Sequence, residues 1–278
     1  MILETGATGT VGREVVSLLV ARGERVRAVS RTPATAGLPA GVEVVAGDLA
    51  EPASLAPHLA GVDAVFLIWP FTDPAVARKH ASEVTCLIAA TATRIVYLSA
   101  PGAADQPESF WAVVERAVEA SGAEWTFLRP VGFAANTLMW AGQIRAGDVV
   151  RWPYGAAARS LVHERDLAEV AVAALTSAGH SGARHLLSGP ATLTQEEQVR
   201  AIGRAVGRDL RWSEMPLGEA RQMLAAAFGD PDFAEIALRG WAAFVDHPEQ
   251  VTDTVERITG HPARPYADWA ADHADAFR

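Results

Sequence analysis

Lysine is almost absent from this chain of 278 residues, in which Lys79 is the only lysine. Tyrosine is also scarce, with three residues, and none of them is followed four positions later by a lysine. A proton-donating Tyr and Lys pair at that spacing is thereby excluded. Positive charge is in deficit as well, with a net charge of -9 and an isoelectric point near 5.4. A surface that binds nucleic acid needs a basic face, so we expect no nucleic-acid partner.

Cysteine and long apolar runs are the other shortages. The single cysteine, Cys86 in ASEVTCLIAATA, excludes an internal disulfide, and we expect a buried helix thiol in a reducing compartment. No apolar run is long enough to span a bilayer, and no basic segment followed by an apolar one precedes the first strand. We therefore expect a cytoplasmic protein without membrane association, whose oligomeric state the sequence leaves open.

The pattern of apolar residues changes along the chain. Up to about Pro130, short apolar runs such as VFLI and IVYL alternate with helical patterns, as in a parallel sheet covered by helices. From about Thr192, helices dominate and are separated by prolines and glycines. The sequence predicts an α/β fold, with a doubly wound parallel-sheet domain of Rossmann type over 1–132 that takes up returning segments near 160–190. A smaller, mostly helical lobe is expected over 133–278.

The stretch TGATGTVG, residues 5–12, places a glycine-rich turn between a predicted strand and a predicted helix. Such a turn brings backbone amides and a helix N-terminus against a pyrophosphate. Gly6 permits the turn, Gly9 lets the backbone approach the phosphates, and Gly12 allows the helix to pack on the strand. The GxxGxxG spacing has many false matches, but the surrounding strands and helix support it. The predicted cofactor-binding residues here are Gly6, Thr8, Gly9, Thr10, Val11 and Gly12.

The end of the second predicted strand, AVSRTP, indicates which dinucleotide binds. An acidic residue there would bond the ribose of NAD, whereas Arg31 accommodates the 2′-phosphate of NADP. The alternative is an ordinary exposed arginine. The third strand ends in AGDL, where Asp48 and Leu49 would border the adenine. Asp48 is equally consistent with a turn or cap residue.

Several motifs together carry a family resemblance: TGATGTVG, SRTP, GDL, YLSA, SGAEWTFLRP followed by FAAN, and the tail DTVERITGHPARPYADWAADHADAF. In this order and spacing the chain resembles the NmrA-like family of atypical, extended short-chain dehydrogenases, from Gly6 nearly to Phe277. The resemblance implies a doubly wound domain that binds NADP(H) in preference to NAD(H). It also implies that the smaller lobe lies on the side of a small-molecule substrate.

The same resemblance implies further site residues. Trp69, Pro70 and Phe71 would pass near the ribose and pyrophosphate. Asn136 is similar to a family residue, with capping of the following helix as the alternative. The residues expected beside the nicotinamide are Ser99, Ala100, Pro130, Val131, Gly132 and Phe133.

Two departures from the family stand out. Glu4 occupies a central strand position where an apolar residue is usual, and we expect it to face an arginine or polar cluster, or to lie at a more open strand end. Short-chain dehydrogenases also pair a Ser after the fifth strand with Tyr-x-x-x-Lys, and only Ser99 is present here. The residues nearest to the places of that Tyr and Lys are Trp111 and Glu115. Glu115 is expected to have a structural role or to contact the ribose.

Two functional classes follow from these residues. The first is an NADPH-dependent oxidoreductase acting on a quinone or another conjugated, aromatic or polyketide-like carbonyl, with Ser99 as a hydrogen-bond donor to a developing oxyanion. The second is a non-catalytic NADP(H)-binding redox sensor. The segment from Phe228 to Phe244 is expected to form an apolar wall of the substrate cleft, or to serve packing alone. The eight histidines are dispersed, so no dedicated metal site is predicted.

Overall fold

The computed structural model describes residues 1–229 and 231–278, without the side chains of Phe228, Asp232 and Phe233. The chain divides into two compact units. Unit 1 comprises Met1–Pro130, Glu164–Leu187 and Thr254–His261. Unit 2 comprises Val131–His163, Ser188–Asp253 and Pro262–Arg278. Each unit is thus assembled from three separate stretches of chain.

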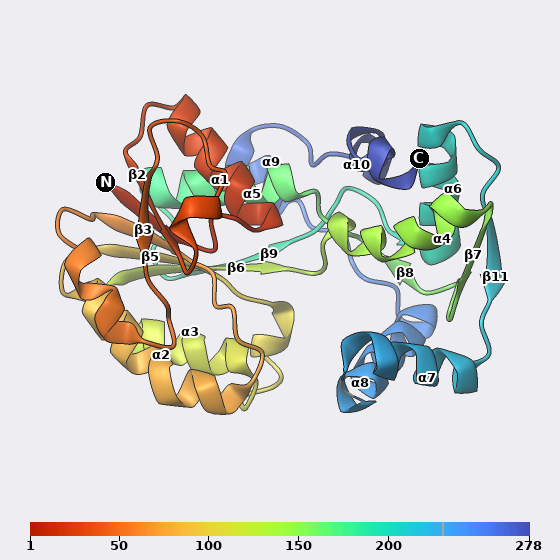
Figure 1. Ribbon diagram of the computed structural model, residues 1–278, viewed down its shortest axis with the longest axis horizontal. Coiled ribbons are helices and arrows are strands. Elements are labelled where there is room, and N and C mark those ends of the chain that lie inside the picture. Colours follow the sequence, from red (N-terminus) through yellow and green to blue (C-terminus); the bar gives the residue numbers. More distant parts are fainter. Residues whose placement is uncertain (230) are drawn as a thin grey trace. The chain divides into compact units, whose positions relative to one another are not determined.

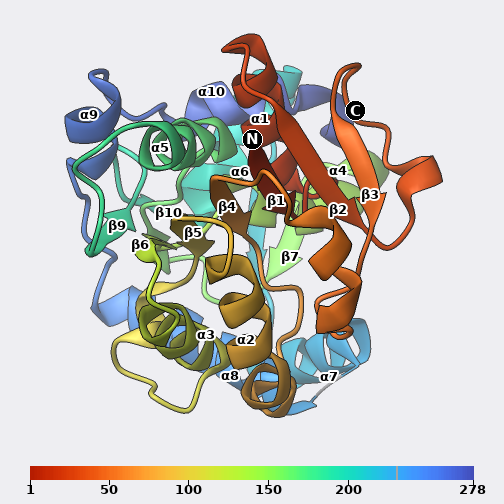
Figure 2. The same cartoon turned by 90° about the vertical axis from the view of Figure 1, so that its left-hand side faces the viewer.

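Unit 1 is built on a seven-stranded sheet with the order β3-β2-β1-β4-β5-β6-β9, in which all neighbouring strands are parallel (Figure 1). Helices α1 and α5 lie together on one face of the sheet, and α2 and α3 on the other (Figures 1 and 2). The predicted doubly wound parallel sheet is thereby confirmed. The strands are β1 (Ile2–Thr5), β2 (Val26–Ser30), β3 (Glu43–Ala46), β4 (Ala64–Leu67), β5 (Arg94–Leu98), β6 (Glu124–Pro130) and β9 (Ala183–Leu187). The helices are α1 (Thr10–Ala21), α2 (Pro74–Ala89), α3 (Phe110–Ala120), α5 (Glu164–Thr176) and α9 (Thr254–Thr259).

The apolar strands account for this layered arrangement. All four residues of β4 are buried, because helices cover both faces of the sheet. Val65 and Leu67 share one core with Val84 and Ile88 of α2. Burying each such side chain contributes about 1.5–3 kcal/mol.

Two expectations, about the burial of Cys86 and about the surroundings of Glu4, were wrong. Cys86 is exposed, because α2 turns Val84 and Ile88 toward the sheet and leaves Cys86 on the other side. Glu4 is fully buried in β1, and neither carboxylate oxygen has a hydrogen-bond partner among residues 1–229 and 231–278. It therefore faces no arginine or polar cluster, and burial holds the pKa of its carboxyl well above the ordinary value. The neutral acid is the form that such a site tolerates.

Unit 2 has its own core, which includes the fully buried side chains of Trp140, Trp269 and Phe277. The unit begins with a 3₁₀ segment, η5 (Ala134–Trp140), followed by the short α4 (Ala141–Ala146). Two-stranded sheets pair β7 (Val149–Trp152) with β11 (Arg211–Glu214), and β8 (Ala158–Arg159) with β10 (Leu193–Thr194). The remaining helices are α6 (Gln195–Val206), α7 (Leu217–Phe228), α8 (Pro231–Asp246) and α10 (Tyr266–Asp272). In the described part of the chain, each helix is too short or too polar to cross a bilayer.

Candidate functional site

The glycine-rich turn leaves β1 at a fixed point. The Thr5 hydroxyl accepts a hydrogen bond from the Ile68 amide at 2.8 Å and donates one to the Ile68 carbonyl at 3.0 Å, which joins the ends of β1 and β4. Gly6 then adopts a left-handed φ of 90°, and the Gly9 amide donates to the Gly6 carbonyl at 2.9 Å. Helix α1 begins directly afterwards with no side-chain cap at Gly9. Its first amide groups therefore remain available as donors to an anion.

The three glycines differ in what they make room for. A Cβ on Gly12 would overlap the Gly6 carbonyl and lie 2.6 Å from Oε1 of Glu4, so this position admits no larger residue without a shift. A Cβ on Gly9 would meet its nearest protein atom, the Gly6 oxygen, at 3.3 Å. Gly12 is thus required by packing of the helix on the strand. At Gly9 the protein would need to shift by only a few tenths of an ångström, a smaller change than at Gly12, which fits a position reserved for a ligand.

A cavity of about 430 Å³ opens beside this turn at the carboxyl ends of β1, β2, β3 and β4. It gathers six predicted residues: Gly6, Thr8, Arg31, Asp48, Leu49 and Pro70. It also includes six residues that the sequence reasoning missed: Thr5, Val29, Ser30, Thr32, Gly47 and Ile68. They follow the same strand ends, and the rule that ligands bind outside the carboxyl ends of parallel strands could have found them.

Arg31 and Asp48 have different surroundings in this cavity. Arg31 is exposed, so its guanidinium is accessible to a ligand. The Asp48 carboxylate accepts a hydrogen bond from the Ala50 amide at 2.9 Å, so the residue serves a turn while it also lines the cavity. The turn role expected for Asp48 is thus confirmed, while its place beside the adenine stays a prediction.

The other predicted site residues do not line this cavity in the described part of the chain. Trp69 is buried, with its ring edge-on to Phe71 at 5.5 Å between centroids. Pro130 ends β6 in unit 1, whereas Val131, Gly132, Phe133 and Asn136 belong to unit 2. Besides these four residues of unit 2, the predicted residues outside the lining are Gly9, Thr10, Val11, Gly12, Trp69, Phe71, Ser99, Ala100 and Pro130.

Ser99 takes part in a buried polar network at the end of β5. Its hydroxyl donates to Oε1 of Glu115 at 2.6 Å. Arg129 holds the same carboxylate with two hydrogen bonds, at 2.9 Å and 2.6 Å, and this bond to Glu115 raises the pKa of Arg129 further. Because a serine hydroxyl carries one proton, Ser99 in this arrangement offers only lone pairs to any other group. Glu115 thus has a structural role in this network, and the sequence reasoning missed Arg129.

Unit 2 contains a cavity of about 360 Å³ with mainly apolar walls. Its lining consists of Asn136, Met139, Arg159, Ala237, Gly240, Trp241 and Phe244. The Arg159 guanidinium lies 4.7 Å from the centre of the Phe244 ring and forms an ion pair with Glu249 at 2.7 Å. The α8 part of the predicted apolar wall thus lines a cavity, while the side chains of Phe228 and Phe233 lie outside the described residues.

Asn136 is no helix cap in this unit. Phe133 is the residue at the N-cap of η5, and Trp140 is the one at the N-cap of α4. Asn136 lies within η5, exposed, at the edge of the cavity.

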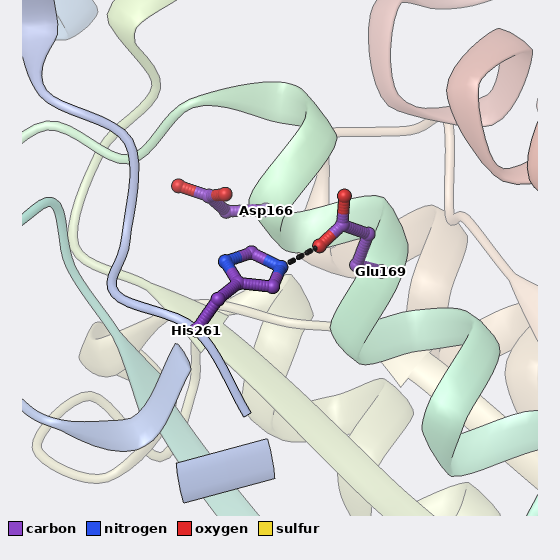
Figure 3. Close-up of side chains that lie close together, drawn as sticks. All are labelled: Asp166, Glu169 and His261. Carbon is purple, nitrogen blue, oxygen red and sulfur yellow. Dashed lines mark hydrogen bonds and ion pairs between the residues drawn. The ribbon is translucent and has the colours of Figure 1, made fainter. Parts of the chain in front are cut away.

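A group of metal-ligating residue types occurs in unit 1, where Asp166, Glu169 and His261 each place one ligand atom within 4.8 Å of the others (Figure 3). The imidazole of His261 points toward Glu169, and the two side chains meet at 2.5 Å. Such a separation leaves no space for an ion between them. The pair is therefore an imidazole and carboxylate contact that joins the segment after α9 to α5.

Two relatives match this chain along its whole length. A protein of Streptomyces griseus subsp. griseus, named (4-alkanoyl-5-oxo-2,5-dihydrofuran-3-yl)methyl phosphate reductase, is 40% identical over 284 residues, which cover 100% of this chain and 99% of the relative. An NAD(P)H azoreductase of Xenophilus azovorans is 37% identical over 285 residues, with coverage of 100% and 99%.

The solved structures include a similar fold. The triphenylmethane reductase of Citrobacter sp., complexed with NADP(H), has a TM-score of 0.83 and 22% sequence identity, covering 99% of this chain and 100% of its own. The family model described as NAD(P)H-binding matches residues 6–178, more than half of the chain and the whole glycine-rich turn from Gly6 onward. The protein therefore belongs to the NAD(P)H-binding family.

Proposed function

We propose that this protein is an NADPH-dependent reductase of a planar, conjugated small molecule, either a quinone or a conjugated carbonyl compound of polyketide type. Within its family we assign it to the NmrA-like group of atypical short-chain dehydrogenases and place it in the cytoplasm. The observation that carries the proposal is the cavity of about 430 Å³ with the glycine-rich turn in one wall and Arg31 in another. The reductase names of its full-length relatives support the same conclusion.

The residues around this cavity suit NADPH in particular. The uncapped first turn of α1 contains no acidic residue, so its amide groups would hold the pyrophosphate without competition. The Arg31 guanidinium would pair with the 2′-phosphate, and Asp48 and Leu49 would border the adenine. When bound, NADPH supplies a hydride from C4 of its nicotinamide ring.

The class of acceptor follows from two observations. The Streptomyces relative is named for a furanone whose ring double bond is conjugated to carbonyl groups, and the Xenophilus relative for azo compounds. Both contain an electron-poor double bond, and an acceptor of this class delocalises the negative charge that hydride addition creates. Water can then deliver the proton. This chain, which lacks the Tyr and Lys pair, would need no strong side-chain acid for such an acceptor.

The protein would contribute mainly positioning of the two reactants. Correct placement of two reactants can remove about 7–11 kcal/mol of a barrier at best. The aromatic walls at Trp241 and Phe244 suit a flat apolar molecule, and the exposed Asn136 amide offers it one polar contact. Ser99 would act as an oxyanion donor only if its hydroxyl rotated away from Glu115 and gave up that hydrogen bond.

The test is the loss of NADPH absorbance with a naphthoquinone, an unsaturated lactone, an azo dye and an aliphatic ketone. We expect turnover of conjugated acceptors and none of the ketone, because only the former stabilise their reduced anions. Turnover of the ketone would contradict the proposed acceptor class. Tight NADPH binding without any turnover would instead favour the second candidate, a non-catalytic NADP(H) sensor, which the missing Tyr and Lys pair makes worth testing. Absence of NADPH binding would refute both.

A further inference from the structure

Arg13 makes an unusual set of contacts on the outside of the nucleotide cavity. It follows Gly12 in the first turn of α1, is exposed, and does not line the cavity itself. Its guanidinium donates three hydrogen bonds, all to backbone carbonyls. Nε bonds the Thr8 oxygen at 3.0 Å, Nη1 the Gly37 oxygen at 2.9 Å, and Nη2 the Ala36 oxygen at 3.0 Å. Every nitrogen of the planar group is therefore used once.

These carbonyls belong to segments that form two different walls of the cavity. Thr8 lines it from the glycine-rich turn. Ala36 and Gly37 end the segment that starts with Ser30, Arg31 and Thr32, all three of which line it on the other side. Arg13 thus joins the phosphate-facing turn to the segment that bears the proposed 2′-phosphate contact.

The segment between Arg31 and Gly37 is tied together internally, so a contact at its end bears on Arg31. The Ser30 hydroxyl accepts a hydrogen bond from the Thr32 amide at 3.1 Å, and the Thr32 carbonyl accepts one from the Thr35 amide at 3.2 Å. Ala36 is buried, and Gly37 adopts a left-handed φ of 58°. That conformation favours glycine, and there the Gly37 carbonyl accepts from Arg13.

We infer that Arg13 is a positioning residue that sets the place of Arg31 relative to the glycine-rich turn, and thereby the selectivity for NADPH over NADH. This inference rests on the proposed NADPH function. NADH lacks the 2′-phosphate that Arg31 would bind, so its affinity depends on the turn but little on where Arg31 stands. Only a fork of several donors can join both segments, and a lysine at this position cannot replace it.

The experiment compares wild type, Arg13→Met and Arg13→Lys, with Arg22→Met as a matched control because Arg22 is an exposed arginine at the other end of α1. NADPH and NADH are titrated into each purified protein. In both Arg13 variants we expect NADPH affinity to fall about tenfold, the loss of one charge-assisted contact, and NADH affinity to stay within about twofold. Arg22→Met should match wild type. Amide hydrogen exchange over residues 32–37 should speed up in both Arg13 variants.

Two outcomes would overturn the inference. The first is an unchanged NADPH to NADH ratio in Arg13→Met, either because neither affinity changes or because both fall equally, which indicates a general effect on the fold. Retention of the wild-type ratio by Arg13→Lys would show that charge and not the fork matters. If wild type itself prefers neither nucleotide, the proposed coenzyme preference fails. The hydrogen-exchange comparison then still shows whether Arg13 fastens the segment.

Discussion

Two cavities among the described residues, of about 430 Å³ in unit 1 and about 360 Å³ in unit 2, have walls of different kinds. In unit 1 the walls include two glycines, the ends of four strands and the glycine-rich turn that leads into the uncapped α1. In unit 2 they are side chains of tryptophan, phenylalanine and methionine around one arginine. Backbone amides recognise the pyrophosphate that every dinucleotide shares, whereas side chains, such as Arg31 in unit 1 and the aromatic residues in unit 2, can be altered one at a time. Unit 1 should therefore be most sensitive to added atoms and unit 2 to atoms removed.

The largest effect should come from adding atoms at Gly12. We expect Gly12→Val to lower the free energy of unfolding by about 3 kcal/mol or more, because its side chain would collide with the Gly6 carbonyl and Glu4. Denaturant unfolding measures this. In Gly9→Ala, where the nearest protein atom is 3.3 Å away, the fold should persist while NADPH affinity is lost. A stable Gly12→Val protein would break the contrast between the two glycines.

Reversal of coenzyme preference should rank second. Arg31→Asp replaces the proposed phosphate contact with a repulsive carboxylate, and we expect NADPH affinity to fall about a hundredfold, or about 2.7 kcal/mol. NADH affinity should stay level or rise. Titration of both nucleotides into wild type and variant measures the ratio. Equal affinity of wild type for the two would show that Arg31 is only an exposed arginine.

Glu4 allows a pH test of burial in unit 1. Burial raises the pKa of its carboxyl, so the folded protein keeps a proton that the unfolded chain releases above the ordinary pKa of 4.5. Stability should therefore fall with rising pH, by at most about 1.4 kcal/mol per pH unit, until the raised pKa is reached. Glu4→Gln should remove this slope and be more stable than wild type at alkaline pH. Parallel pH profiles for the two proteins would contradict the neutral buried acid.

In unit 2 the matching test removes atoms. Trp241→Ala takes away one aromatic wall of the cavity, and we expect KM for a conjugated acceptor to rise about tenfold, or about 1.4 kcal/mol. The dissociation constant of NADPH should not change. Trp212→Ala, which lies outside the lining, is the control and should lower stability without raising KM. A change in NADPH affinity of Trp241→Ala would contradict the assignment of this cavity to the acceptor.

The smallest effect should follow from Ser99→Ala. The variant loses the hydrogen bond to Glu115, so we expect the free energy of unfolding to fall by about 1 kcal/mol. Because Arg129 still holds Glu115, kcat should change less than about tenfold. Steady-state kinetics and thermal unfolding decide between the roles. A hundredfold loss of kcat would establish the oxyanion donor predicted from the sequence.

Short-range sequence patterns predicted the fold of unit 1. The glycine-rich turn lies within eight residues, and strands that are apolar on both faces indicate a parallel sheet covered by helices. Arg31 was found because it directly follows a strand end. What escaped prediction depends on residues far apart in the sequence, such as Arg129 of β6 meeting Glu115 of α3, which requires α3 to pack against β6.

Unit 2 resisted prediction for the same physical reason. Its cavity takes residues from η5, β8 and α8, whose order along the chain says nothing of their meeting. Glu4 was misjudged differently. Its position in a covered strand was predicted. A buried carboxyl without a hydrogen-bond partner is tolerated only as the neutral acid, and sequence patterns do not show the protonation state.

The interleaving of the two units along the chain has a consequence for how the protein is made. Strand β9 and helix α5 belong to unit 1 but are synthesised only after Val131–His163 of unit 2. While the ribosome extends this stretch, β6 remains an open sheet edge, and the part of the sheet that α5 covers, over β4, β5 and β6, stays exposed beside α1. Nascent chains of about this length are accordingly the ones that should need a chaperone, and slow translation near residue 130 should lower the yield of folded protein.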